Sequence, residues 1–143
     1  MGPPSGGARG VTRVGVGCGA AILRAGRLLL VQRRKAPEAG SWSLPGGKVD
    51  FLERAEDATR REIAEEIGLA IELGPLLCLT QMIGLDGQHW VSPVYRARAA
   101  TGEPLNCEPD KLAAIGWFAL DDPPAPLAQA AREAIAVLRS EGA

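Results

Sequence analysis

A glycine-rich turn that leads directly into an uninterrupted helix constrains this 143-residue chain more than any other feature. The tripeptide PGG at positions 45–47 interrupts helices and strands alike, because proline lacks an N–H group and glycine is costly to order. Residues 53–67 contain neither glycine nor proline, are rich in Ala, Glu and Arg, and are followed by Gly68. This pattern predicts a helix over 53–67 with a glycine C-cap, preceded by a loop over 35–50.

Three glutamates would share one face of this helix. Glu62, Glu65 and Glu66 are spaced i, i+3 and i+4, and successive helical residues are about 100° apart. Carboxylates at these spacings repel one another by a few tenths of a kcal/mol per pair, which a bound cation would offset. Their hard oxygen atoms suit Mg²⁺ or Mn²⁺, ions that complete their coordination with water and substrate phosphates.

A solvated acidic surface is the alternative for such a helix taken alone. The glycine loop at its N-terminal end favours the metal site, because backbone without side chains can approach a metal ion or a pyrophosphate closely. The helix N-terminus also provides a favourable field for anions. We therefore predict a site for a divalent cation and a phosphate ligand at this junction.

Apolar runs elsewhere in the chain predict two hairpins. Apolar residues alternate with small ones over 11–23 and form a continuous run over 27–33, with a tight turn expected at 25–26. Two further runs, over 76–83 and 90–97, flank the turn sequence LDG. We expect each pair of runs to form an antiparallel hairpin.

The C-terminal part predicts one more strand and a closing helix. Residues 114–120 form a short apolar run, and apolar residues recur at helical spacing over 125–141, with Pro126 suited to the first turn. The order strands, helix, strands, helix lacks a regular βαβ alternation. It predicts an α+β fold, an α/β/α sandwich in which helices flank a mixed β-sheet.

Composition limits the domain organisation and the classes of partner. A length of 143 residues with 46% hydrophobic residues suits one domain, which we place at 11–143 after a flexible tail over 1–10. A net charge of −1 argues against binding nucleic acid through bulk electrostatics. The three cysteines are far apart, and no secretory leader or 18-residue apolar run is present. We therefore expect a cytoplasmic protein without a membrane partner.

The segment around the acidic helix resembles the Nudix box, G-x5-E-x7-R-E-U-x-E-E-x-G-U with U apolar. The matching residues are Gly47, Glu53, Arg61, Glu62, Ile63, Glu65, Glu66, Gly68 and Leu69. Weaker likeness extends from the first strand through LPGG at 44–47 to EPDK at 108–111 and WFALD at 117–121. This order resembles the small MutT-type branch of the Nudix hydrolases, whose box folds as loop, helix and loop against a mixed sheet.

The resemblance implies a metal-dependent hydrolase that cuts a phosphoanhydride bond. Carried over, Glu62, Glu65 and Glu66 would be the main metal ligands, together with the carbonyl group of Gly46. The base that takes the proton from water would be a box glutamate such as Glu65 or Glu66, or else a glutamate outside the box. The products would be a nucleoside monophosphate and pyrophosphate, or a phosphorylated second product.

Several residues outside the set of metal ligands are candidates for a functional role, and each also has an alternative interpretation. Glu108 is the candidate base outside the box, and an exposed loop acid is its alternative. Glu53 is expected to orient Arg61 through a charge-assisted bond, although Glu53 could also lie near the metals. Arg33 would bind substrate phosphates or be a solvated strand end.

Three further residues are candidates for contact with the substrate. The backbone of Gly47 can approach a pyrophosphate closely. Trp42 precedes the glycine loop and would either stack on a base or pack in the core. His89, the only histidine, would contact the base or a metal, or occupy an ordinary position in the sheet.

Three functions remain in competition at this point. The first is a nucleoside triphosphate pyrophosphohydrolase, and the second is a hydrolase of ADP-ribose or another nucleoside diphosphate sugar. The third is a non-catalytic nucleotide-binding domain, which the presence of all four box glutamates disfavours. Base selectivity depends on the shape of a pocket built from distant segments. Exposed strand edges also predict a homodimer.

Overall fold

The computed structural model describes residues 13–142, which form two helices and eight strands. The strands are β1 (Gly15–Ala21), β2 (Leu23–Arg24), β3 (Arg27–Arg33), β4 (Trp42–Ser43), β5 (Gly46–Lys48), β6 (Ala70–Leu85), β7 (Gln88–Thr101) and β8 (Leu112–Ala119). The helices are α1 (Ala55–Ile67) and α2 (Gln129–Ser140). Residues 1–10, where we predict a flexible tail, lie outside the described part.

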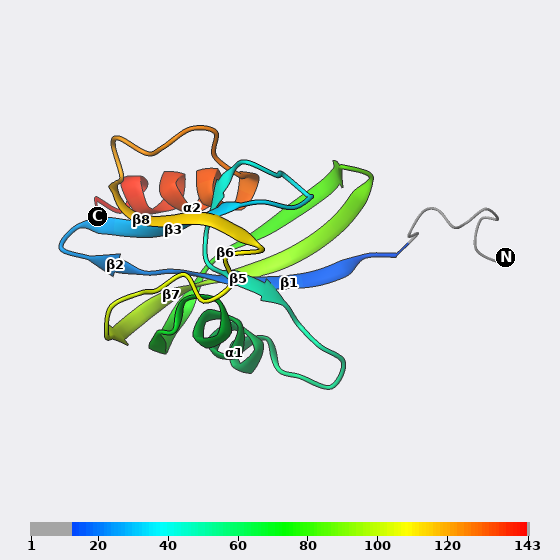
Figure 1. Ribbon diagram of the computed structural model, residues 1–143, viewed down its shortest axis with the longest axis horizontal. Coiled ribbons are helices and arrows are strands. Elements are labelled where there is room, and N and C mark those ends of the chain that lie inside the picture. The colour runs from blue at the N-terminus through cyan, green and yellow to red at the C-terminus, as the bar shows by residue number, and fades with distance from the viewer. Residues whose placement is uncertain (1–12, 143) are drawn as a thin grey trace, which may run out of the picture.

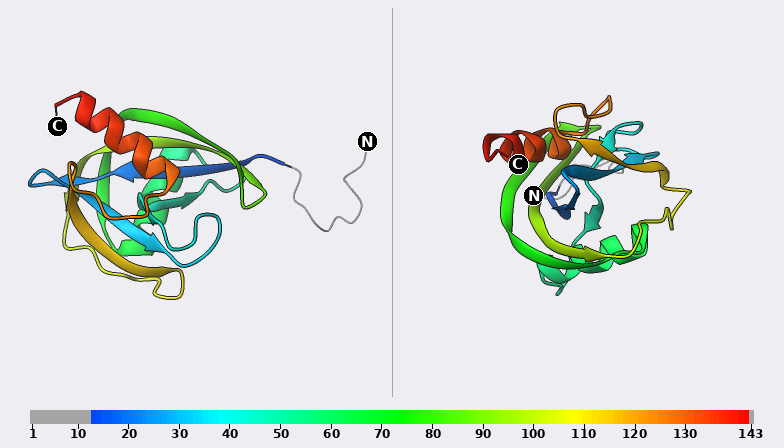
Figure 2. Two further views of the ribbon diagram at one scale, coloured as in Figure 1. Left: turned by 90° about the horizontal axis from the view of Figure 1, so that it is seen from above. Right: turned by 90° about the vertical axis from the view of Figure 1, so that its left-hand side faces the viewer.

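The strands form two sheets that lie between the helices. One sheet has the order β5-β1-β7-β6, in which β1 and β7 run parallel, and the other contains β2, β3 and β4, with β8 paired to β3. Helix α1 lies on one side of the strands and α2 on the other (Figure 1). The long strands β6 and β7 curve around from the α2 side to the α1 side (Figure 2). The predicted α+β fold with helices flanking mixed β-structure is confirmed.

The core explains why strand β3 is a continuous apolar run. Leu28 and Leu30 pack in a cluster with Ile135 and Leu138 of α2, among other residues. The alternate residues of β3 pack in a second cluster, which contains Ile63 and Ile67 of α1. Because successive side chains of a strand point to opposite faces, a strand covered by a helix on each side has to be apolar throughout.

The first predicted hairpin is correct only at its turn. Leu23 pairs with Leu28 and Arg24 with Arg27, but β1 then pairs with β5 and β7, whereas β3 pairs with β4 and β8. The two strands diverge because each is covered on both sides and becomes the centre of a different sheet. Local periodicity identifies such strands but does not identify their distant partners.

The segment over 35–50 is not entirely the loop that its turn-forming residues predict, because it contains β4 and β5. Gly46 and Gly47 pair antiparallel with Gly19 and Cys18 of β1. A Cβ atom on Gly46 would collide with the carbonyl oxygen of Cys18. The glycines therefore permit a close backbone approach that a larger residue would prevent.

Both helices begin later than predicted. Helix α1 starts at Ala55 and ends at Ile67, and the expected C-cap is confirmed, because Gly68 has φ 70° and its N–H donates to the carbonyl of Ala64 at 3.0 Å. Helix α2 starts at Gln129, so Pro126 precedes it, and the Pro126 carbonyl accepts from the backbone N–H of Trp42 at 2.8 Å. The segment before α2 thus bonds to β4 and does not join the helix.

The second predicted hairpin is present and is longer than expected, because β6 and β7 extend over 70–85 and 88–101. Register shifts between Glu72 and Cys78 absorb the glycine and proline at 74–75. The last predicted strand, at 114–120, corresponds to β8. No helix within residues 13–142 is long and apolar enough to cross a membrane.

We expect the substitution Gly68→Ala to lower the free energy of unfolding by about 1 kcal/mol, because alanine is strained at a left-handed φ. Urea denaturation followed by circular dichroism measures this change. The matched variant Gly68→Asn should lose less, since asparagine tolerates this conformation better. Equal losses in the two variants would contradict the explanation.

Candidate active site

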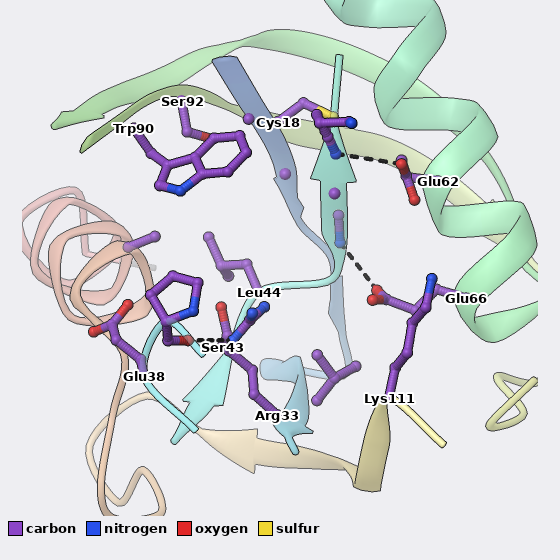
Figure 3. A pocket seen from close by; sticks show the side chains of 18 of the residues that line it. Cys18, Arg33, Glu38, Ser43, Leu44, Glu62, Glu66, Trp90, Ser92 and Lys111 are labelled. Carbon is purple, nitrogen blue, oxygen red and sulfur yellow. Dashed lines mark hydrogen bonds between the residues drawn. The ribbon is translucent and has the colours of Figure 1, made fainter. Parts of the chain in front are cut away.

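A cleft of about 410 Å³ opens between the glycine segment, α1, the loop after β3 and the start of α2. This volume lies in the range of small-molecule sites, roughly 300–1,000 Å³. One end is lined by the carboxylates of Glu62, Glu66 and Glu108. The other end contains apolar side chains, among them Leu44 and Trp90, and Figure 3 shows Trp90 across the cleft from Glu62 and Glu66.

Glu62 and Glu66 are bound to the backbone of the glycine segment. The N–H of Gly46 donates to Glu66 Oε1 at 3.1 Å, and the N–H of Lys48 donates to Glu62 Oε2 at 3.2 Å (Figure 3). Glu62 Oε1 and Glu66 Oε2 accept no hydrogen bond from the described residues. The predicted placement of these two carboxylates on one face of α1, beside the glycine segment, is thus present in the structure.

Gly47 has no side chain at the point where α1 comes closest to β5. A Cβ atom at this position would collide with the carboxylate of Glu62. Any residue larger than glycine would therefore displace the Glu62 side chain or move the helix. Gly46 and Gly47 both line the cleft, where the half-buried backbone of Gly46 and the exposed backbone of Gly47 can contact a ligand.

The Glu66 carboxyl group has a strongly perturbed pKa. Burial, together with the nearby charges of Glu108 and Glu62, raises the pKa from its ordinary value of 4.5 to about 7, against the opposing effects of the Gly46 N–H and Arg33. The ionised form of Glu66 is therefore disfavoured mainly by burial. A cation bound in the cleft would favour the ionised form of Glu66.

Arg61 holds the segment before the helix in place. Its Nε and Nη2 atoms donate to the two oxygens of Glu53, both at 2.8 Å, and Nη2 also donates to the carbonyl of Lys48 at 3.1 Å. This fork of hydrogen bonds lowers the pKa of Glu53 to about 2. The structure thus pairs Glu53 with Arg61, as the sequence predicts.

Glu65 lies apart from the other two helix glutamates. Its Oε1 atom is 3.2 Å from Arg61 Nη1, its side chain is 53% exposed, and Glu65 is not among the residues that line the cleft. Only two of the three predicted helix ligands therefore face the cleft directly. Arg61 Nη1 also lies 3.2 Å from Glu62 Oε2. Glu65 thus shares a contact with Arg61 but does not line the cleft with Glu62 and Glu66.

The donor set of the cleft fits a magnesium-type ion. Within residues 13–142, no three His, Cys, Asp or Glu side chains are already gathered in a metal-binding arrangement. Mg²⁺ is usually held by only one or two carboxylates and takes its other ligands from water and substrate phosphates. Glu62 and Glu66, each with one oxygen free of protein partners, match that requirement.

Glu108 enters the same cleft from a loop that is bound to the end of α1. The N–H groups of Leu105 and Cys107 donate to the carbonyls of Ile67 and Glu66, at 2.9 and 3.0 Å. These bonds satisfy carbonyl groups that have no partner inside the helix and fix the loop next to Glu66. Glu108 Oε2 lies 3.6 Å from Lys111 Nζ, which also lines the cleft.

Among the other predicted contacts, Arg33 lies in the cleft and two do not. The Nε atom of Arg33 donates to the Pro37 carbonyl at 2.7 Å. Trp42 packs edge-on against Phe118, with ring centroids 4.9 Å apart, in the core cluster below α2. His89 pairs with Ile83 in the β6–β7 ladder. Trp42 and His89 thus take the alternatives of core packing and an ordinary sheet position.

Trp90 and Glu38 are among the cleft residues that the sequence does not predict. Trp90 lies on β7, and its indole occupies the space above Gly15, where a Cβ atom would come within 2.6 Å of two ring carbons. Glu38 lies in the loop after β3. The neighbours of both come from distant segments, so the local sequence carries no signal for either.

Comparison with known proteins gives consistent matches over most of the chain. The NUDIX domain model matches residues 12–138. The crystal structure of a MutT NUDIX hydrolase from Burkholderia pseudomallei is 56% identical, superimposes with a TM-score of 0.84, and covers 88% of this chain and 98% of its own.

Two curated relatives also match. One from Mycobacterium tuberculosis, named "Putative 8-oxo-dGTP diphosphatase 2", is 41% identical over 86 residues, which are 59% of this chain and 60% of that protein. The "Oxidized purine nucleoside triphosphate hydrolase" of Danio rerio is 33% identical over 107 residues, which are 72% of this chain and 65% of that protein. The chain thus spans less than two thirds of the length of either relative.

The raised pKa of Glu66 predicts a pH-dependent stability in the absence of divalent ions. The pKa of Glu66 in the folded protein, about 7, exceeds its ordinary value of 4.5. The contribution of Glu66 to the free energy of unfolding is therefore favourable below pH 4.5 and is lost as the pH rises through 7. The shift of this pKa from 4.5 to about 7 corresponds to a loss of about 3 kcal/mol in the free energy of unfolding. The variant Glu66→Gln should therefore gain stability relative to the unmodified protein between pH 4.5 and 8.

Urea denaturation in the presence of a chelator, at several pH values, measures this difference. Glu72→Gln is the matched control, because Glu72 is exposed on β6 and lies outside the cleft. A stability difference between Glu66→Gln and the unmodified protein that stays constant over this pH range would contradict the prediction.

Proposed function

Because this chain belongs to the NUDIX family, we propose that it hydrolyses the phosphoanhydride bond of a nucleoside triphosphate to release a nucleoside monophosphate and pyrophosphate. The observation that carries this proposal is the pair Glu62 and Glu66, bound to the glycine segment with one oxygen of each free toward the cleft. A site of this kind suits a divalent ion together with a diphosphate, and the apolar end of the cleft suits a base.

We propose Mg²⁺ or Mn²⁺ as the cofactor. Glu62 and Glu66 would be the main protein ligands of this ion. The carbonyl group of Gly46 and a reoriented Glu65 would be the remaining protein ligands. When bound, such an ion neutralises phosphate charge and makes water a stronger nucleophile. Arg33, whose guanidinium is already held by the Pro37 carbonyl, would bind the substrate phosphates together with the backbone of Gly47.

We propose Glu108 as the general base, with Glu66 as the alternative. A carboxylate that binds a cation has fewer lone pairs left for a proton, whereas Glu108 lies on the loop bound to the end of α1 and is not bonded to the glycine segment. Lys111 Nζ, 3.6 Å from Glu108 Oε2, would help to hold the Glu108 carboxylate in position. Water would then lose its proton to Glu108 as its oxygen bonds to a phosphorus atom of the substrate, while the bridging P–O bond of the anhydride breaks and the monophosphate and pyrophosphate separate.

The names of the two curated relatives support a triphosphate with an oxidised purine base as the substrate class. We also propose a cytoplasmic location and a homodimer. We place the activity in the cytoplasm, because Cys18, Cys78 and Cys107 are free and a reducing compartment suits them. A homodimer through β6 is favoured because this strand lies at the edge of its sheet.

A substrate panel tests the proposed function. The unmodified protein is incubated with Mg²⁺ and dNTPs, NTPs, 8-oxo-dGTP, ADP-ribose or dinucleoside polyphosphates, and the products are separated by chromatography. We expect turnover of at least one triphosphate, with pyrophosphate as a product and with loss of activity in a chelator. Preference for ADP-ribose over every triphosphate would replace the proposed substrate class, and absence of hydrolysis would favour a binding domain.

The variants Glu62→Gln and Glu108→Gln should change different kinetic properties. Loss of a ligand in Glu62→Gln should raise the Mg²⁺ concentration needed for half-maximal rate, whereas loss of the base in Glu108→Gln should lower kcat about 100-fold or more without changing that concentration. Steady-state rates over a Mg²⁺ titration measure both. Glu103→Gln, exposed and outside the cleft, is the control. A Glu108→Gln variant with an unchanged kcat would return the base role to a helix glutamate.

A further inference from the structure

Glu38 is held in an unusual backbone conformation at the end of the cleft away from the helix glutamates. Its φ is 62°, in the left-handed region that residues with a Cβ atom rarely occupy. Its N–H donates to Asp86 Oδ2 at 2.9 Å, and its carbonyl accepts from the N–H of Ser41 at 3.1 Å. Backbone conformations of this kind persist where the surroundings enforce them, and they concentrate at ligand sites.

The Glu38 carboxylate is fixed as well. Its Oε2 atom accepts from the backbone N–H of Gln129, the first residue of α2, at 2.8 Å. Its Oε1 atom accepts no hydrogen bond from the described residues, and Glu38 lines the cleft together with Ala130 of the same helix. One oxygen is thus committed to the helix, and a second acceptor of fixed position remains for a ligand.

Trp90 provides a flat surface at the same end of the cleft. Its indole packs on the backbone of Gly15, and its Nε1 atom donates to Gln88 Oε1 at 2.8 Å. The indole N–H is therefore already used, and the ring offers its apolar face. Figure 3 shows Trp90 and Glu38 on the side of the cleft opposite Glu62 and Glu66. Aromatic faces of this kind stack on nucleobases with little preference among them.

A nucleotide with its phosphates at the acidic end would place its base at this opposite end. Stacking on Trp90 would fix the plane of the base but would not distinguish one nucleobase from another. Selection among bases therefore requires a polar group that contacts the edge of the base. Glu38 lines this end of the cleft, and its Oε1 atom, a carboxylate acceptor without a partner among the described residues, favours N–H donors and repels carbonyl oxygens.

We propose that Glu38 is a specificity-determining residue that accepts a hydrogen bond from the exocyclic amino group of the substrate base. The inference rests on the proposed function, because it concerns the base of the same nucleotide. Cytosine, adenine and guanine carry such an amino group. Uracil and hypoxanthine lack it and present a carbonyl oxygen or a hydrogen atom in its place. A hydrogen bond to a charged group corresponds to about tenfold selectivity.

The variant Glu38→Gln tests this role sharply. The side-chain oxygen of glutamine can still accept from the Gln129 N–H, so the bond to α2 is retained while the amide NH₂ group replaces the free acceptor. We measure kcat/KM for the pairs dCTP and dUTP, dATP and dITP, and dGTP and dITP. The unmodified protein should prefer the amino-bearing member about tenfold, and Glu38→Gln should abolish or reverse the preference.

Two further variants separate this role from a structural one. Glu133→Gln makes the same chemical change on α2, where Glu133 bonds the side chain of Gln129 outside the cleft lining, and it should keep the original ratios. Glu38→Gly removes the carboxylate but adopts a φ of 62° freely. It should fold, as circular dichroism can show, and should lose the preference.

Binding of the monophosphates dCMP, dUMP, dGMP and dIMP, followed by NMR titration, gives a readout that needs no hydrolysis. If no triphosphate is hydrolysed but Glu38→Gln shifts these affinities by the predicted factor, the proposed function fails and the role of Glu38 stands. If Glu38→Gln keeps the original ratios in both assays, Glu38 only supports the start of α2 and the inference is overturned.

Discussion

The hydrogen bonds from the backbone of β5 to Glu62 and Glu66 determine the arrangement of the whole acidic site. They join a strand and a helix that are connected by a loop of only a few residues, and they bring two like charges close together in a partly buried cleft. Such an arrangement persists only if no side chain intervenes between β5 and α1, which requires glycine at 47, whereas the close backbone of Cys18 and Gly19 on β1 requires glycine at 46. The same bonds orient each carboxylate, so that one oxygen is engaged and the other is left for a ligand.

The helix reaches this position because its other contacts leave it little freedom. Ile63 and Ile67 anchor α1 in the core, with relative exposures of 0%, and Arg61 binds the preceding loop through Glu53 and Lys48. Arg61 therefore neutralises charge beside the site without entering the cleft itself. Burial, more than the neighbouring carboxylates, raises the pKa of Glu66, and a cation bound in the cleft would compensate for the charge of its ionised form.

The sequence predicts the local parts of this molecule well and the distant pairings poorly. Spacing along a helix places Glu62 and Glu66 on one face, and the glycine after Ile67 marks its end, because both depend only on neighbouring residues. The pairing of β1 with β7, and the place of Trp90 above Gly15, depend on chain segments about 75 residues apart. Trp42 shows where sequence-based prediction stops. Its position beside the glycine segment fits stacking on a ligand and core packing equally, and its contact with Phe118 in the structure distinguishes the two.

Both ends of the cleft are built from helix termini, for a common physical reason. The last carbonyl groups of α1 lack partners within the helix and accept from the loop that carries Glu108, whereas the first N–H of α2 donates to Glu38. Loops that bond to helix ends inherit the rigidity of the core below them, because both helices are anchored in it by buried side chains. An acid on such a loop keeps its position without a bound ligand. Glu108 and Glu38 are thus held at opposite ends of one cleft before any nucleotide binds, which agrees with the roles that we propose for them, proton transfer for Glu108 and recognition of a base for Glu38.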